Sequence, residues 1–459
     1  MLLSKKKILA TEVVALLRLA MPVSLSQLLM VGMTATDTIV AGNAGAVELA
    51  GMSLGANVWN IVLLFFMGIG MATQPLIAKK YGSGDNQKVR EQLIQSIWMC
   101  LLLGLFAVLV TLFISIMISE LNFEPALSEI ASDYLFISML GTLPLTLIPA
   151  FRGTLEGVGE TQLVLFVSVI GFLINIPLDI AFVNGLGWIP PLGGSGCALA
   201  TGIVSWGMLF SYCFLLRFNR KLKKLSLLRS IKSPDIVLIK KTFEFGLPIG
   251  LSICLELSMF SAVVVFISYL GIVQASAHAI AMTIASMSFV LYLGLGQGVT
   301  IRASQFLGAH QGGLANRAAL VGLFSNIAIS LIVCVVFVLG GSYLVGLFTS
   351  DRSVSTIAVT LLYYAAMFQV ADCLQVTIIS ILRAYGDTSS PLFAQCFVYL
   401  LCAIPAGGII IHTEAFEALK NPEALWSVII VSLVTVSIIL IPKLLSVFGK
   451  EDTLSSTQA

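Results

Sequence analysis

The chain alternates between long apolar runs and short polar segments. Each apolar run reaches about 20 residues, the length that an α-helix needs to cross the hydrocarbon core of a membrane. Membrane β-strands need only about 9–11 residues, and backbone in lipid must satisfy its own hydrogen bonds, so the runs predict helices. About twelve runs are present, beginning near Val13, Leu49, Leu93, Tyr134, Leu163, Ser195, Phe245, Ala277, Ala318, Val354, Leu392 and Leu425.

The composition leads to the same class. Hydrophobic residues make up 58% of the 459 residues and charged residues only 10%. A soluble domain carries about 25% charged residues, so this chain has too little polar surface for water. We expect an all-α integral membrane protein with 12 transmembrane helices, whose surrounding solvent is the lipid bilayer.

The N-terminus is short and basic, with Lys5, Lys6 and Lys7, like the start of a signal peptide. The apolar run that follows is longer than the usual h-region of about 7–15 residues, and no small-residue cleavage site ends it. We interpret this run as the first retained span.

Basic residues indicate how the spans are oriented. If both termini are cytoplasmic, 23 of the 25 Lys and Arg residues fall in cytoplasmic segments, and only Arg352 and Lys420 fall outside. The positive-inside rule therefore predicts a multi-pass protein of the plasma membrane, the inner membrane of a bacterium, with both termini cytoplasmic. No basic arm for nucleic acid is present, because the basic residues lie in short loops.

The two halves of the chain are related. Several prolines and glycines coincide when the first half is shifted by 226 or 227 residues: Pro22 with Pro248, Gly45 with Gly271, Gly68 with Gly294, Gly82 with Gly308 and Gly159 with Gly386. We predict an N-terminal six-helix lobe at 1–225, a cytoplasmic basic linker at 226–242 and a C-terminal six-helix lobe at 243–459. Parallel repeats of this kind are common in transporters, which bind substrate between the repeats.

Four acidic residues lie inside the predicted spans: Asp37, Asp179, Glu256 and Asp372. A charge at mid-membrane costs at least about 2.5–3.5 kcal/mol. No Lys or Arg of the same spans lies at a similar depth, so we expect these acids to bind protons or cations. None of the four has an acidic counterpart in the other half, which favours a specialised role. The alternative is that each acid only hydrogen-bonds a neighbouring helix.

In the first half, Asn175 and Asp179 are four residues apart and share a helix face. Asp37 lies in the polar stretch TATDT, and Thr201 follows a run of small residues that allows close helix approach. These four residues can form an all-oxygen site for a hard cation or a shared proton. For Asn175 and Thr201, hydrogen bonding between helices is the competing interpretation.

In the second half, Phe368 precedes Asp372 by one helical turn, on the same face. A carboxylate pair formed by Glu256 and Asp372 beside this ring can hold a cation, such as Na⁺, by charge and by the ring quadrupole. Further Met and aromatic side chains either form plain core or line a cavity for flat apolar cations. These residues are Met259, Met282, Met287, Phe289 and Tyr292.

The remaining residues with possible chemistry are assigned no role. His278 and His310 are isolated, and the eight cysteines form neither a CxxC pair nor a Cys/His cluster. We interpret the cysteines as small buried apolar residues, without metal or disulfide functions.

A series of motifs runs in order along nearly the whole chain. They are TATDTIVAG with Asp37, RGTLEGVGET at 152–161, NIPLD at 175–179, LGGSGCALAT at 192–201, CLELS with Glu256, FQVADCLQ with Asp372 and RAYGDT at 383–388. With these motifs the chain resembles the multidrug and toxic compound extrusion (MATE) family, in its NorM-like branch.

The resemblance implies twelve helices in two six-helix bundles that form a V. It also implies antiport, in which Na⁺ or H⁺ enters as an organic cation leaves. By similarity, Asp37, Asn175, Asp179 and Thr201 match the site of the amino-terminal lobe. Glu256 and Asp372 match the cation site of the carboxy-terminal lobe. Some relatives carry Tyr where Phe368 stands, and the stretch after His412 matches poorly.

We therefore expect a secondary transporter, not an enzyme, that exports small organic cations such as drugs and dyes. We expect a monomer with no cofactor besides the coupling ion. The sequence leaves Na⁺ and H⁺ open. A lipid-linked oligosaccharide flippase would need several Arg or Lys deep in its spans, where we find none. An intramembrane metalloprotease would need HExxH, and an aspartyl protease would need YD paired with GxGD; the sequence contains neither HExxH nor YD. A receptor would not need a repeat with unduplicated acids.

Overall fold

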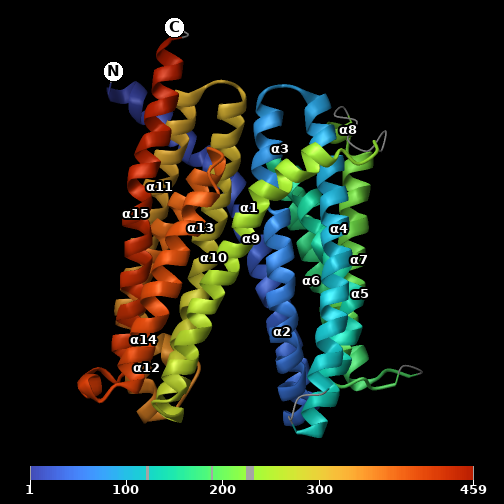
Figure 1. Ribbon diagram of the computed structural model, residues 1–459, viewed down its shortest axis with the longest axis vertical. Helices are drawn as coiled ribbons and strands as arrows, with labels where there is room; N and C mark the ends of the chain where they lie inside the picture. The colour runs from blue at the N-terminus through green and yellow to red at the C-terminus, as the bar shows by residue number, and fades with distance from the viewer. Residues whose placement is uncertain (1, 120–123, 188–189, 224–231, 458–459) are drawn as a thin grey trace. The chain divides into compact units, whose positions relative to one another are not determined.

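The computed structural model describes residues 2–119, 124–187, 190–223 and 232–457, which are almost entirely helical (Figure 1). Within these ranges, twelve helical segments are long and apolar enough to cross a membrane. The predicted all-α fold with twelve spans is thereby confirmed.

Six spans come from the first half of the chain. They are α1 (Leu2–Ala44), α2 (Ala46–Gly70) with its continuation α3 (Thr73–Gly82), α4 (Asn86–Ser119), α5 (Pro125–Gly157), α6 (Thr161–Asn184) and α7 (Ser195–Phe218). The short helix α8 (Arg220–Lys223) follows them.

Six more spans come from the second half. They are α9 (Ile236–Ser268), α10 (Ile272–Gly308), α11 (Gly312–Gly346), α12 (Arg352–Ala384), a composite span and α15 (Pro422–Thr457). The composite span joins α13 (Ser389–Gln395), the π-helix η1 (Cys396–Ala403) and α14 (Ile404–His412), and a 3₁₀ turn, η2 (Glu414–Leu419), leads to α15.

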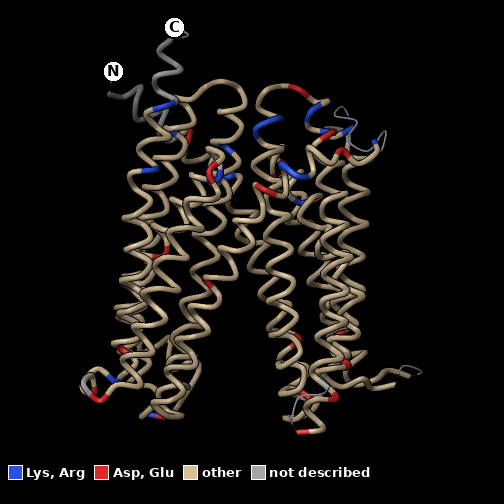
Figure 2. The backbone as a smooth tube through the Cα atoms, in the orientation of Figure 1, with Lys and Arg blue, Asp and Glu red and all other residues tan. Residues whose placement is uncertain are grey.

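The surfaces of the helices are apolar to a degree that water would not tolerate. Large side chains point outward along the spans; Phe113 is 63% exposed and Leu339 is 82% exposed. Lys and Arg, by contrast, gather mainly at one end of each unit (Figure 2). Exposed apolar flanks with charges at the ends are what a hydrocarbon environment requires.

The internal repeat is visible in the backbone. Gly159 follows α5 with φ +87°, and its repeat equivalent Gly386 follows α12 with φ +92°. Both turns have the same hydrogen bonds, since Glu160 N donates to Leu155 O and Asp387 N donates to Leu382 O. A positive φ favours glycine, which has no Cβ to clash, so the paired glycines mark the same turn in both halves.

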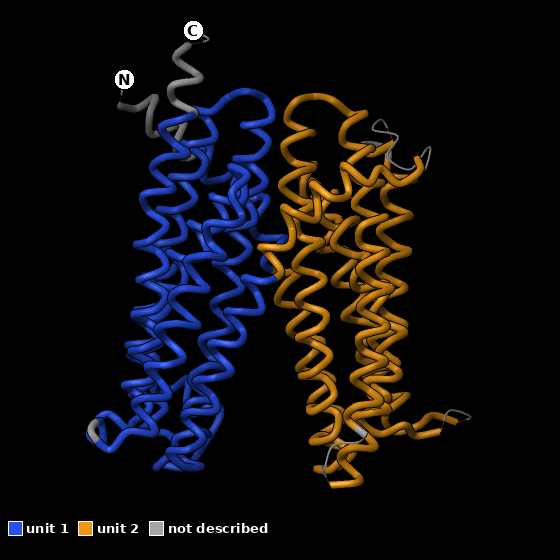
Figure 3. The backbone as a smooth tube through the Cα atoms, viewed as in Figure 1, with its two compact units in different colours: residues 1–24, 251–459 blue, residues 25–250 orange. Residues whose placement is uncertain are grey.

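The chain divides into two compact units (Figure 3). One unit comprises 25–250 and the other comprises 1–24 together with 251–459. Each unit has its own apolar core, one running from Met33 to Leu222 and the other including Leu16 and extending to Leu444.

The units differ from the predicted lobes because each half sends its first stretch to the other unit. Ala20 packs in the unit that contains 251–459, where a Cβ at Gly298 would lie 3.2 Å from the Ala20 Cβ. Its repeat equivalent Gly246 packs in the unit formed by 25–250, where an added Cβ would lie 3.1 Å from the Ala72 Cβ. The change of unit comes two residues after Pro22 in α1 and two residues after Pro248 in α9.

Candidate cation-binding sites

The unit formed by 25–250 brings together the four polar residues predicted for the first half. Asn175 and Asp179 lie on α6 and are fully buried. The Asn175 Nδ2 donates to Asp179 Oδ1 at 3.3 Å. The carboxyl group of Asp37, on α1, lies close enough to Asp179, Asn175 and Thr201 for all three to interact with it.

Small residues explain how α7 reaches this position. A Cβ at Gly196 would lie 2.7 Å from the backbone carbon of Phe182, so α7 begins in direct contact with the α6 backbone. Leu192 N also donates to Phe182 O at 2.9 Å. This approach places Thr201, one to two turns further along α7, beside the polar face of α6.

Glu48 holds the start of α7 in place, and sequence reasoning missed it. The Glu48 Oε2 accepts a hydrogen bond from Gly194 N at 2.5 Å, across 146 residues of sequence. Its position in α2 next to a small-residue loop is not apparent from the pattern of apolar and polar residues.

The oxygens of this site are poorly satisfied by the protein. Asp37 Oδ1, Asn175 Oδ1, Asp179 Oδ2 and Thr201 Oγ1 are buried and have no hydrogen-bond partner among the described residues. An unpaired buried polar atom costs about 1–3 kcal/mol, and a charged group costs more. Four such atoms in one place are therefore suited to a ligand that accepts several oxygens, either a cation or a proton shared between carboxylates.

The second predicted pair lies in the unit that contains 251–459. Asp372 on α12 is buried, and its Oδ1 has no partner within the described residues. Glu256 on α9 is half-buried, and its charge acts on Asp372. The charges of the two acids therefore interact, and their joint cation site stays a prediction.

Phe368 lies in an aromatic cluster. Its ring meets Trp426 edge to face at 5.9 Å and Phe260 at 6.0 Å between ring centres. Trp426 Nε1 in turn donates to Nδ1 of the buried His278 at 3.1 Å. His278, which received no role from the sequence, therefore positions Trp426 behind the ring of Phe368.

Buried amides continue from Asp372 along α12 and were not predicted. Tyr399, in the π-helix η1, donates from its hydroxyl to Gln375 Oε1 at 2.9 Å. The Gln375 Nε2 and Gln395 Oε1 are buried without a partner in the described part of the chain. Single glutamines in apolar runs carry little signal, and a π-helix leaves no mark in hydropathy.

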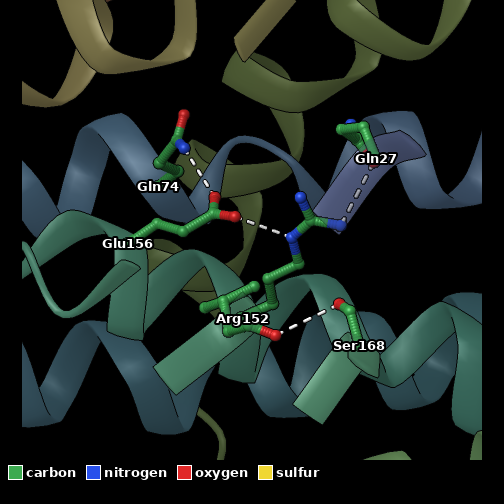
Figure 4. A network of polar contacts seen from close by, with 6 residues as sticks. Gln27, Gln74, Arg152, Glu156 and Ser168 are labelled. Carbon is green, nitrogen blue, oxygen red and sulfur yellow. Dashed lines mark hydrogen bonds and ion pairs between the residues drawn. The ribbon is translucent and has the colours of Figure 1, made fainter. Parts of the chain in front are cut away.

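Two arginines lie within the last two turns of their helices, and each is paired with a glutamate. Arg152 on α5 is 17% exposed and donates from Nε to Glu156 Oε1 at 2.7 Å. Gln74 and Gln27 complete this network (Figure 4). Arg302 on α10 pairs with Glu12 of α1 at 2.9 Å.

Arg383 lies in the last turn of α12, three turns beyond Asp372. Its charge acts on Glu256 of α9 and partly offsets the negative charge of that acid. The sequence did not indicate this partner, because α9 and α12 are far apart along the chain.

The Met and aromatic residues proposed for a cavity are dispersed. Met259 and Tyr292 are buried in the core at 1% and 0% exposure, whereas Met287 is 55% exposed. Met282 and Phe289 are half-buried. Their exposures thus range from core to surface, and a common cavity for organic cations stays a prediction.

Both halves of the chain match a known protein family. The MatE family profile matches residues 22–181 and 248–408, the two segments that the internal repeat relates. The protein named "Probable multidrug resistance protein NorM" of Mannheimia succiniciproducens is 31% identical over 444 residues, which cover 96% of this chain and 95% of that protein.

Solved structures show the same fold. A MOP superfamily transporter from Pyrococcus furiosus has a TM-score of 0.83 at 20% identity and covers 97% of both chains. The eukaryotic MATE transporter AtDTX14 has a TM-score of 0.84 at 18% identity, covering 97% of this chain and 99% of the other. Both halves match the family profile and the bacterial relative aligns over nearly its full length, so the chain belongs to the MatE family of multidrug transporters.

Proposed function

We propose that this protein is a secondary antiporter that exports small, mostly cationic organic compounds in exchange for Na⁺ or H⁺. It would lie in the plasma membrane as a monomer with both termini in the cytoplasm. The observation that carries the proposal is the group of four buried, unpartnered oxygens at Asp37, Asn175, Asp179 and Thr201.

The mechanism follows from competition for these oxygens. Two carboxylates close together cannot both stay charged in an apolar environment without a positive ligand. A proton or Na⁺ can supply that charge in one state of the transporter, and an organic cation can supply it in the other. Because the coupling ion and the organic cation cannot bind these oxygens at the same time, the entry of one is coupled to the exit of the other.

Glu256 and Asp372 form a second cation-binding site in this proposal. Asp372 retains an unpartnered, buried oxygen, so it can take a proton or a cation together with Glu256. Arg383 lowers the net negative charge of this group. This second site should therefore bind a monovalent cation more weakly than a pair of acids without a neighbouring arginine would.

The energy available is sufficient for accumulation. A membrane potential of 100 mV supplies about 2.3 kcal/mol for each charge that moves inward. A tenfold concentration ratio corresponds to about 1.4 kcal/mol. One net charge per cycle therefore supports an export gradient of more than tenfold, before any gradient of the ion itself is added.

A flippase for lipid-linked sugars is less well supported. Its cavity would use unpaired Arg or Lys to bind phosphate. The arginines Arg152 and Arg302 are each paired with a glutamate, Glu156 and Glu12, and so their charges are already neutralised.

The decisive experiment measures ethidium uptake by inverted membrane vesicles that contain the Asp37→Asn variant. We expect ethidium transport to fall to the level of vesicles without the protein. The neutral amide cannot bind the coupling ion and the organic cation in turn, as the carboxylate can. Asp133→Asn is the matched control, since Asp133 is an exposed acid of the same unit, and its transport should equal that of the unmodified protein.

Separate Na⁺ and pH gradients then identify the coupling ion. Transport that follows only one gradient assigns that ion to the antiport. Full ethidium transport by Asp37→Asn, with normal protein levels, would defeat the proposal.

A further inference from the structure

A thiol lies at the acid site of the unit formed by 25–250. Cys197, on α7, is fully buried, and its sulfur lies 3.6 Å from the backbone oxygen of Asp37. One ligand atom from each of Asp37, Asp179 and Cys197 falls within 4.8 Å of the others. This is the one such trio of His, Cys, Asp or Glu found in the described residues.

The sulfur changes the ligand class that the site can accept. Carboxylate, amide and hydroxyl oxygens favour hard ions such as Na⁺. A thiolate is a soft ligand, which favours Zn²⁺ and similar transition-metal ions over Na⁺ and Mg²⁺. The combination of two carboxylates with one thiolate matches the ligand types, and the ligand number, of zinc sites that keep an open position.

The spacing is compatible with a single ion. Zinc binds sulfur at about 2.3 Å and carboxylate oxygen at about 2.0–2.2 Å, so two ligands of one ion lie at most about 4.5 Å apart. The trio within 4.8 Å therefore needs only small side-chain rotations to close on a metal ion.

The unpartnered atoms point to a ligand independently of the thiol. Asp179 and Asn175 are fully buried, and Asp179 Oδ2 and Asn175 Oδ1 have no hydrogen-bond partner among the described residues. Asp37 Oδ1 is likewise unpartnered. A divalent ion would satisfy both carboxylates at once, which a single monovalent ion does less completely.

We propose that Asp37, Asp179 and Cys197 form a site for Zn²⁺ and chemically similar divalent ions. Binding releases to solvent the proton of the Cys197 thiol and any proton that the two carboxylates share, while the metal–sulfur and metal–oxygen bonds form. This inference rests on the proposed function in one respect. The metal ion occupies the binding site of the coupling ion and so blocks the exchange of that ion for the organic cation.

Cobalt provides the direct test, because a Co²⁺–thiolate bond gives a charge-transfer absorption in the near ultraviolet that oxygen ligands do not give. The purified protein in detergent is titrated with Co²⁺ and then with Zn²⁺. We expect one equivalent of Co²⁺ to produce the band and Zn²⁺ to abolish it, with release of a proton detected by calorimetry in two buffers.

Matched variants assign the band. Cys197→Ala should remove it and weaken Zn²⁺ binding by about tenfold or more, because one of three ligands is lost. Cys100→Ala, which alters an equally buried cysteine of the same unit, should retain both. Asp179→Asn should weaken Zn²⁺ binding while keeping a weaker band, since the sulfur remains.

The outcomes separate this inference from the proposed function. A missing band in the unmodified protein, or a band that persists in Cys197→Ala, overturns the metal site whatever the variants' stability. These spectra need no transport, so that result leaves the ethidium assay of Asp37→Asn untouched. If the unmodified protein shows the band and Asp37→Asn retains full transport, the proposed coupling-ion site is refuted, whereas the metal site is supported.

Discussion

Arg152 and Glu156 form a buried ion pair near the C-terminal end of α5. They are one turn apart on α5, and Gln74 Nε2 also donates to Glu156 Oε2 at 2.6 Å. Removing one member of a buried pair strands the other charge, which costs about 3–5 kcal/mol. We expect Glu156→Gln to lower the unfolding free energy by about 3 kcal/mol, measured as a lower midpoint of thermal unfolding in detergent.

An exposed pair of the same spacing is the control for that prediction. Lys240 and Glu244 are also four residues apart, but their side chains are 73% and 59% exposed. Surface pairs contribute about 0–1 kcal/mol, so Glu244→Gln should scarcely move the midpoint. Equal losses in the two variants would show that burial does not set the strength of the α5 pair.

Some residues of the candidate site could be predicted and others could not. Asp37 and Asp179 stand out because charges in apolar runs are rare, and the four-residue spacing of Asn175 and Asp179 fixes a shared helix face. Cys197 was interpreted as plain core because a lone cysteine has no sequence partner. Gln375 was missed because a single glutamine in an apolar run carries no periodicity, and its partner Tyr399 is revealed only by the fold.

At the scale of helices, hydropathy located every span but placed most starts too late. The fourth span was expected near Tyr134 and begins at Pro125, and the seventh was expected near Phe245 and begins at Ile236. Hydropathy detects the part of a helix that meets hydrocarbon, whereas hydrogen bonding continues into the polar ends. The π-helix η1 was not foreseen, because it changes the bonding pattern and not the apolar composition.

The contact between α6 and α7 depends on the absence of a side chain at Gly196. A Cβ there would lie 2.7 Å from backbone carbon of Phe182, which cannot move aside as a flexible side chain would. We expect Gly196→Ala to push α7 away from α6, to lower the thermal midpoint and to weaken Co²⁺ binding at Cys197.

Gly207 lies on the same helix and offers the matched control. Apart from the adjoining residues of its own helix, no described residue has an atom within 4 Å of the position that its Cβ would take. Alanine inside a helix is favoured over glycine by about 0.5–1 kcal/mol, so Gly207→Ala should leave the midpoint unchanged or raise it. If Gly196→Ala behaved in the same way, close approach of the two helices would not be what forms the site.

For the whole molecule, the repeat governs how the chain is divided. The first unit boundary falls between Ser24 and Leu25 and the second between Gly250 and Leu251, again 226 residues apart. The repeat was readable from prolines and glycines, but the exchange of the first stretch of each half was not. Sequence similarity aligns positions and does not state which neighbours a segment packs against.

The even number of spans and the distribution of charge predict the orientation of the molecule. The basic linker should face the cytoplasm, and the turn η2 should face the opposite side. Ser233 and Glu417 are exposed positions of these two segments. With the exposed Cys402 replaced by Ser, Ser233→Cys should react with a membrane-impermeant maleimide only in inverted vesicles, and Glu417→Cys only in intact cells.

The two cysteine variants control each other, because each should be silent where the other reacts. In the structure, five of the twelve spans separate positions 233 and 417, so the two cysteines should lie on opposite sides of the membrane. Labelling of both from the same side would contradict this number of spans. Labelling of each from the side opposite to that expected would keep the twelve spans but invert the molecule. The positive-inside rule would then fail for a chain in which 23 of 25 basic residues obey it.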